Sequence, residues 1–72
     1  MKKIKGIVIL ATRDGKAAVI ETELGTYEIN NKVVRTLINF HFPLKEGENV
    51  LLTIDPLQQN SLLGIEKGRI GG

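Results

Sequence analysis

The sequence predicts a small domain of mostly β structure that curls into a single barrel. Three features carry this prediction. The chain has 72 residues, which leaves room for one hydrophobic core. Short β-branched runs recur along it and are separated by turn residues such as Asp14-Gly15 and Leu24-Gly25. Only three residues are aromatic, so the core must be built from Ile, Leu and Val.

The first thirty residues read as a three-stranded meander. An apolar first strand over residues 4–12 stops at Arg13-Asp14-Gly15-Lys16. Asp-Gly between two apolar runs predicts a tight hairpin turn in which both residues have positive φ. The return strand covers residues 16–22, and a turn at residues 23–25 leads to a third strand at residues 26–30. The period-two alternation predicts that one face carries Ala18, Ile20, Thr22, Tyr27 and Ile29.

After residue 30 the hydrophobic period changes from two to that of a helix. Asn30 and Asn31 are good N-caps, because their side chains can accept hydrogen bonds from the free amides of a first turn. The residue before Pro43 avoids the helical region, so the segment ends there. We therefore expect a short helix, with a strand through residues 33–40 as the alternative. The side chains at helical spacing are Val33, Val34, Leu37 and Ile38.

The second half of the chain reads as two more strands. A charged turn at residues 45–48 opens a fourth strand over residues 50–55. A polar loop at residues 56–60 separates it from a fifth strand over residues 62–67. The tail, residues 68–72, holds three glycines and is expected to be flexible. In the fourth strand Val50, Leu52 and Ile54 alternate with Leu51, Thr53 and Asp55, so the two sets are predicted to lie on opposite faces.

Five short strands with a helix between the third and fourth match the order of a five-stranded OB-like β-barrel. Gly6 supports this interpretation, because a glycine within a strand often marks a bend and the first strand must serve both halves of the barrel. An SH3-like barrel with residues 33–40 as a loop is the alternative, and a β-grasp fold is third. We expect one domain, residues 1–67, followed by the tail.

Three segments resemble a known domain: Gly6-Ile7-Val8, residues 24–29 (LGTYEI) and residues 62–65 (LLGI). They are similar to the N-terminal OB domain of the Holliday-junction-binding subunit of the bacterial branch-migration complex. That family has a glycine where this chain has Leu24 and a tyrosine where it has Leu63. The helix-hairpin-helix segments through which that family binds DNA would follow residue 72. In that family the barrel also builds a tetramer, so the resemblance implies assembly as well as DNA contact.

Few residues have the chemistry of an active site. The lone histidine, His41, lies between two phenylalanines, which is typical of a structural residue, and the lone serine, Ser61, lies in a loop. Cysteine is absent, and one histidine with scattered acids does not supply the three or four convergent donors of a metal site. We expect no enzymatic activity, no metal and no cofactor.

We expect the chain to be cytoplasmic and not to be inserted in a membrane. The basic start, residues 1–5, precedes an apolar run of only five residues that ends in the charged turn at Arg13, unlike a signal peptide. No stretch approaches the roughly 20 apolar residues that span a bilayer.

Charge along the chain is arranged in blocks, although the formal net charge is only +2. Residues 1–20 hold five bases and one acid, so a basic patch at the first strand and first loop is predicted. OB domains bind single-stranded nucleic acid on their second and third β-strands. In this chain Glu21 and Glu28 point outward from those β-strands and would repel phosphate groups. The predicted nucleic-acid contacts are Lys3, Lys5, Arg13, Lys16, Lys32 and Arg35.

The first functional hypothesis is a non-catalytic binding or assembly module whose partner is another protein or a second copy of the chain. Leu10, Leu51 and Leu57 are apolar residues that so small a barrel can hardly bury. Alternating charge blocks fix register between complementary surfaces. The alternative is weak, salt-sensitive nucleic-acid binding. A minor alternative is a ubiquitin-like modifier or sulfur carrier that uses Gly71-Gly72.

Overall fold

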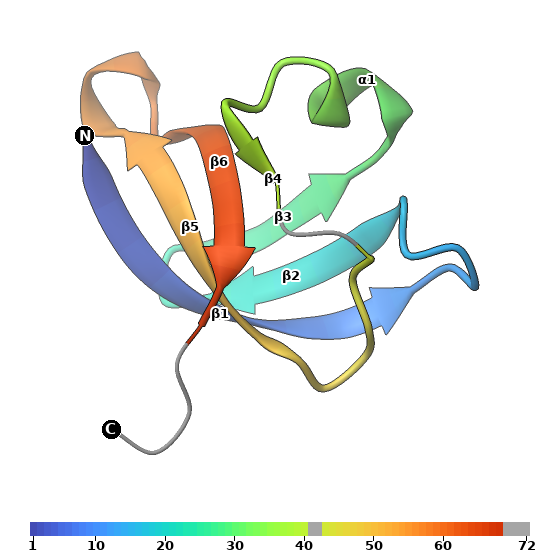
Figure 1. Ribbon diagram of the computed structural model, residues 1–72. Coiled ribbons are helices and arrows are strands. Elements are labelled where there is room, and N and C mark those ends of the chain that lie inside the picture. The colour runs from blue at the N-terminus through green and yellow to red at the C-terminus, as the bar shows by residue number, and fades with distance from the viewer. Residues whose placement is uncertain (41–42, 69–72) are drawn as a thin grey trace.

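The computed structural model describes residues 1–40 and 43–68. Their strands form one sheet in the order β3-β2-β1-β5-β6-β4 (Figure 1). The predicted fold class is confirmed, because five antiparallel strands curl into a half-barrel with one short helix between the third and fourth of them. The elements are β1 (Lys2–Ala11), β2 (Ala18–Thr22), β3 (Gly25–Ile29), α1 (Asn31–Val34), β4 (Asn39–Phe40), β5 (Asn49–Asp55), the 3-10 helix η1 (Pro56–Gln58) and β6 (Ser61–Lys67).

Strand β1 is shared by the two halves of the barrel, as the sequence predicts. Its first part pairs with β5, from Lys2 opposite Ile54 to Ile7 opposite Asn49. Its second part pairs with β2, starting where Gly6 lies opposite Thr22. Figure 1 shows the resulting long curve of β1 beneath the other strands. A Cβ atom on Gly6 would lie 2.6 Å from Cγ2 of Ile20, so only glycine lets the Ile20 side chain pack this closely against β1.

A β-bulge interrupts β1 just before its end. Val8 lies opposite Ile20 and Leu10 lies opposite Val19, so Ile9 is the extra residue. Val8 is buried, whereas Ile9 and Leu10 are both exposed. The bulge therefore shifts the inside–outside alternation of the strand by one residue.

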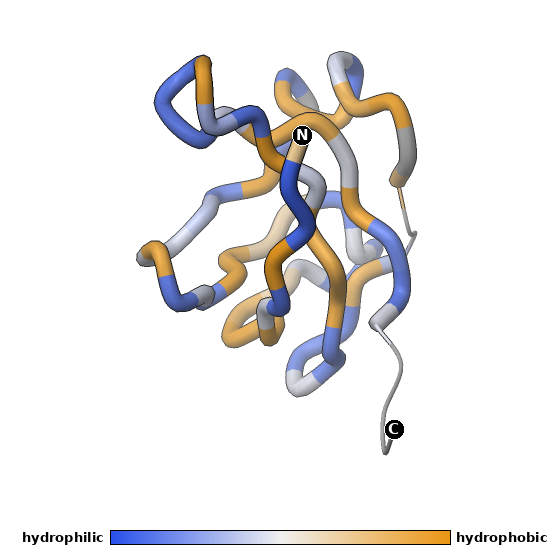
Figure 2. The backbone as a smooth tube through the Cα atoms, turned by 90° about the vertical axis from the view of Figure 1, so that its left-hand side faces the viewer, coloured by the Kyte–Doolittle hydropathy of each residue, from blue (hydrophilic) through white to orange (hydrophobic). Residues whose placement is uncertain are grey.

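The core lies inside the curl, and it is aliphatic as predicted. Along the backbone in Figure 2, hydrophobic stretches alternate with short hydrophilic ones, as expected where strands cross a core and loops face solvent. Half-buried Tyr27 packs against this core and donates a hydrogen bond of 3.0 Å to the carbonyl of Asn60, which links β3 to the start of β6. The buried side chains are Ile4, Val8, Ala18, Ile20, Ile29, Leu44, Val50, Leu52, Ile54 and Ile65.

The loop between β1 and β2 differs from the predicted two-residue turn. The Thr12 amide donates to the Ala17 carbonyl and the Gly15 amide donates to the Thr12 carbonyl, so four residues form the loop. Within it Gly15 has a φ of +70°, but Asp14 does not have positive φ. The Asp14 carboxylate instead accepts from the Thr12 hydroxyl and the Lys16 amide, which holds a wider loop.

This first loop packs against the segment that leads into β5. The Leu44 amide donates to the Gly15 carbonyl at 3.1 Å, and both residues are buried. A Cβ atom on Gly15 would lie 2.4 Å from Cβ of Pro43. The close contact of these two segments thus needs a glycine, both for space and for its backbone conformation.

The predicted helix is present, but it is shorter than the helical spacing of its apolar residues predicts. The Asn30 carboxamide oxygen caps it by accepting from the amides of Lys32 and Val33, as expected. The helix ends at Val34, however, and Ile38 is 67% exposed instead of facing inward. The cause is a long-range pairing: the Ile38 amide donates to the carbonyl of Leu63 and starts the short parallel pairing of β4 with β6. The strand alternative therefore applies only to the two residues of β4.

The second half of the chain follows the prediction closely. Val50, Leu52 and Ile54 are buried along β5. The predicted polar loop contains η1 and then two residues with left-handed backbone, Gln59 and Asn60. In the predicted tail the Gly68 amide donates to the Asn49 carbonyl, and the rest of the tail, including Gly71-Gly72, lies outside the described residues.

We expect Gly15→Ala to destabilise the domain more than Gly47→Ala does. Both glycines have positive φ, but a Cβ atom at Gly47 would meet nothing within 4 Å. Backbone strain should cost about 1–2 kcal/mol at either position. The clash with Pro43 should add roughly 1–3 kcal/mol at Gly15 only. Urea denaturation of both variants checks this, and equal losses would show that the loop contact is not tight.

Candidate binding surface

The outer face of β1 and β2 carries apolar side chains where an ordinary surface strand would carry polar ones. Ile7 and Ile9 are each 41% exposed, Leu10 is 59% exposed, and half-buried Val19 lies opposite Leu10. We call these four residues the outer strip. Ile7 points outward through the ordinary alternation of the strand, whereas Leu10 does so because of the bulge. The strip is therefore set by the backbone and not by a chance side-chain conformation.

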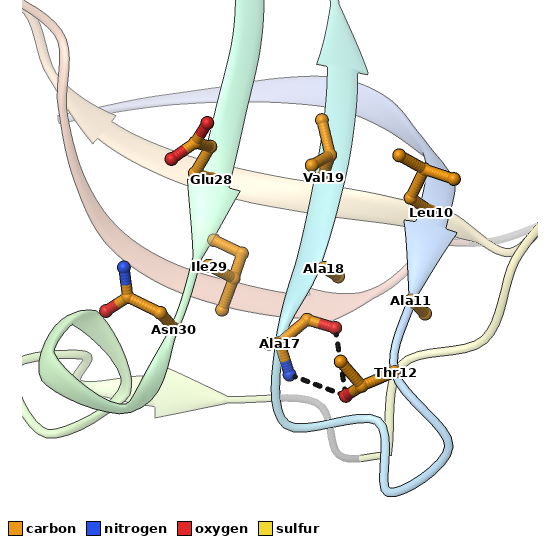
Figure 3. A pocket seen from close by; sticks show the side chains of 9 residues that line it. All are labelled: Leu10, Ala11, Thr12, Ala17, Ala18, Val19, Glu28, Ile29 and Asn30. Atoms are coloured by element: carbon orange, nitrogen blue, oxygen red, sulfur yellow. Dashed lines mark hydrogen bonds between the residues drawn. The ribbon is translucent and has the colours of Figure 1, made fainter.

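A shallow groove of about 320 Å³ continues from the outer strip toward the first loop. Figure 3 shows Leu10, Val19 and Glu28 in one row across the three strands, with Thr12 and Ala17 near the loop. Small side chains keep the groove open and its lining mainly apolar. The groove is lined by Leu10, Ala11, Thr12, Ala17, Ala18, Val19, Glu28, Ile29 and Asn30.

Charged side chains border the outer strip. Lys5 precedes Ile7 by two residues on β1, and Glu21 lies directly opposite Ile7 on β2. Glu28 lies opposite Val19 on β3. All three charged residues are exposed, and none has an ion-pair partner among residues 1–40 and 43–68. The strip thus has an acidic flank on β2 and β3 and a lysine next to its Ile7 end.

The six basic residues predicted to contact nucleic acid fall in separate places. Arg13 and Lys16 line one hollow at the first loop, together with Asn30. Lys3 and Lys5 lie on the first half of β1, about eight residues or roughly 25 Å of strand before Arg13. The Lys3 ammonium forms an ion pair with Glu66.

The remaining two predicted contacts belong to the helix. Lys32 lies within α1 and Arg35 is its C-cap residue, and both are exposed. Neither lines the hollow that holds Arg13 and Lys16. The predicted residues therefore form a pair at the first loop, a pair on β1 and a pair at the helix.

The first loop lowers the pKa of Asp14. The Thr12 hydroxyl donates to its carboxylate at 2.6 Å, and the Lys16 amide donates at 3.0 Å. These two hydrogen bonds, with a smaller contribution from the Lys16 charge, lower the pKa of Asp14 below its ordinary value of 3.8. The loop that borders the groove is thereby held in its shape at neutral pH.

Other candidate chemistry finds little support in the part of the chain that the structure describes. Within residues 1–40 and 43–68, no three His, Cys, Asp or Glu side chains come together as a metal-binding group would. Ser61 is exposed at the start of β6. The lone histidine, His41, lies outside the described residues.

In the described segments, none of the helices has the length and apolar character needed to span a bilayer.

Sequence reasoning identified only part of this surface. Leu10 was expected to stay out of the core, and so were Leu51, which is half-buried, and Leu57, which is 92% exposed. The contribution of Ile7 and Ile9 was missed. The signal was an apolar residue at every position from Ile7 to Ala11, since strict alternation would bury only half of them.

Comparison with protein-family models, curated proteins and solved structures gives no significant match to this chain. The resemblance to the junction-binding barrel thus stays a prediction, and function must be argued from the surface itself.

We expect Thr12→Val to raise the pKa of Asp14 toward 3.8, because the variant removes the largest cause of the shift. In the wild type this carboxylate stabilises the fold above its unfolded pKa, and that contribution is lost as the pH falls through the lower folded pKa. An NMR titration of the Asp14 carboxyl carbon measures both values. Identical midpoints in the two proteins would contradict the assignment of the shift to Thr12.

Proposed function

We propose that this domain is a non-catalytic binding module that recognises another protein surface through the outer strip. The supporting observation is the cluster of Ile7, Ile9, Leu10 and Val19 on one face of two neighbouring strands. Contiguous exposed apolar patches of this kind mark interaction sites, whereas scattered single residues do not. The bulge favours the same interpretation, because β-bulges often serve to re-aim side chains beside functional sites.

The size of the outer strip fits a modest affinity. The exposed fractions of Ile7, Ile9 and Leu10 together equal roughly one and a half fully exposed side chains. Burying that much apolar surface stabilises a complex by about 2–4 kcal/mol. Association itself costs about 4 kcal/mol or more, so contacts beyond the strip must contribute. The groove and the flanking charges are the nearest groups that can supply them.

A catalytic role has less support. The described polar side chains are all at least partly exposed, whereas catalytic groups are typically set in a site that excludes water. The groove is lined mainly by alanine and larger aliphatic residues, and its polar lining consists of Thr12, Glu28 and Asn30. Such a lining suits the side chains of a partner better than a reacting substrate.

Nucleic-acid binding is the second candidate, and one observation favours it. Arg13 and Lys16 share a hollow at the first loop, which flanks the ligand groove in OB-folds. Exposed Glu21 and Glu28 on the neighbouring strands oppose it, because they would repel a phosphate backbone. Among residues 1–40 and 43–68, the same face offers Ile, Leu and Val side chains and no exposed ring on which a base could stack.

We expect a photo-crosslinking amino acid at position 10 to capture a protein, and the same amino acid at position 57 to capture none. Leu57 is the matched control, since it is even more exposed but lies apart from the strip on η1. Mass spectrometry of products formed in a cell extract identifies the captured chain, whether another protein or a second copy. Equal products from both positions, or none from position 10, would contradict the proposal.

An NMR titration with short single-stranded DNA and RNA separates the second candidate from the first. The proposed function predicts no clustered amide shifts. Shifts centred on Arg13 and Lys16 that fade as salt rises would instead support nucleic-acid binding, because phosphate contacts release counterions.

A further inference from the structure

We infer that the partner of the outer strip is a second copy of this chain, bound across a two-fold axis near Ile7. This inference rests on the proposed function and names its partner. In a two-fold contact the same patch faces itself, so each residue pair occurs twice. A patch suited to such a contact must carry apolar groups near the axis and opposite charges on either side of it.

The surface around Ile7 meets this requirement. Ile7 is paired with Glu21 across to β2, and Lys5 lies two residues earlier on the same face of β1. The base and the acid are diagonal neighbours, and a line that runs between them past Ile7 has Lys5 on one side and Glu21 on the other. Both are exposed and lack an ion-pair partner in the described part of the chain, so both are available to a second molecule.

A two-fold axis over Ile7 brings Lys5 of each copy against Glu21 of the other. The two Ile7 side chains then meet near the axis. Leu51 extends the apolar surface on the other side of β1, since it is half-buried and lies opposite Lys5 on the same face. Ile9 and Leu10 of one copy would pack toward Leu51 of the second copy, so all apolar groups of this face gain partners.

The dimer should be weak. A stable interface buries about 800 Å² per partner, and the outer strip is only a small part of such an area. Pairs at the rim of an interface add specificity more than affinity. We therefore expect a rapid monomer–dimer equilibrium with a Kd on the order of 10–500 µM at low salt.

Charge reversal and mixing test the proposed pairing. Lys5→Glu and Glu21→Lys should each raise the Kd for self-association about tenfold or more, because each places like charges together twice. An equimolar mixture of the two variants should restore dimerisation, since both pairs of the mixed dimer are again opposite in charge. Sedimentation equilibrium measures each sample, with NMR spectra to confirm that every variant is folded.

The mixture of the two variants distinguishes a Lys5–Glu21 contact between two copies from a contact within one copy. Lys5 and Glu21 are diagonal neighbours in adjacent strands, and a contact inside one chain could not be repaired by adding a different chain. Lys32→Glu is the charge control, because it changes the net charge equally from α1 and should leave the Kd unchanged. Leu10→Thr should weaken the dimer, whereas Leu57→Thr should not.

A wild-type chain that stays monomeric at about 1 mM would overturn the inference. So would single reversals that keep the wild-type Kd, or a mixture that fails to dimerise. If the chain is monomeric but position 10 still crosslinks to a different protein, the second-copy inference fails while the proposed binding function stands. If position 10 crosslinks to nothing as well, both fail.

Discussion

The double pairing of β1 is the constraint on which the rest of the structure depends. One strand supplies a hydrogen-bonded edge to β2 and another to β5, and Gly6 takes part in both ladders. The core can close only if β1 bends enough to carry the two halves around it. The space for that bend comes from the missing side chain of Gly6, since a Cβ atom there would strike Ile20. Buried Ile20 thus packs against the backbone of Gly6 as well as among the other core side chains.

The surface follows from the same strand. Without the bulge, the alternation of β1 would turn Leu10 inward and Ala11 outward. The outer face of β1 would then lack its most exposed apolar side chain. The extra residue Ile9 reverses both, so that Leu10 is exposed and Ala11 packs against the core. Burying Ala11 in place of Leu10 gives up about 1–2 kcal/mol of hydrophobic stabilisation. In so small a domain such a loss is large, and it would be recovered if Leu10 were covered by a partner.

Local patterns predicted most of the fold, and long-range pairing accounts for what they missed. The strands over Val50 to Ile54 and around Ile20 could be predicted because alternation and turns are local signals. The early end of α1 could not, because it depends on a hydrogen bond from Ile38 to Leu63, far along the chain. The bulge was equally hidden, since the pairing of Leu10 with Val19 is a property of two strands and not of either sequence. For the same reason the separation of the basic residues into three places was not foreseen, although each was named.

The basic side chains of this surface favour nucleic acid as a partner, whereas its apolar side chains favour a protein. Of the two contributions, the apolar one is expected to be larger at physiological ionic strength. The basic residues lie in separate pairs, and Lys3 is already occupied by Glu66. Exposed contacts to phosphate groups weaken steeply as the salt concentration rises. The two cations at the first loop would therefore bind single-stranded nucleic acid poorly at physiological ionic strength. The apolar strip does not weaken in this way, because burial of hydrocarbon does not depend on screening. Glu21 beside Ile7 repels a phosphate but attracts a lysine, and this chain presents a lysine at the matching position of the same face. The acid that argues against nucleic acid is therefore the group that argues for a second copy.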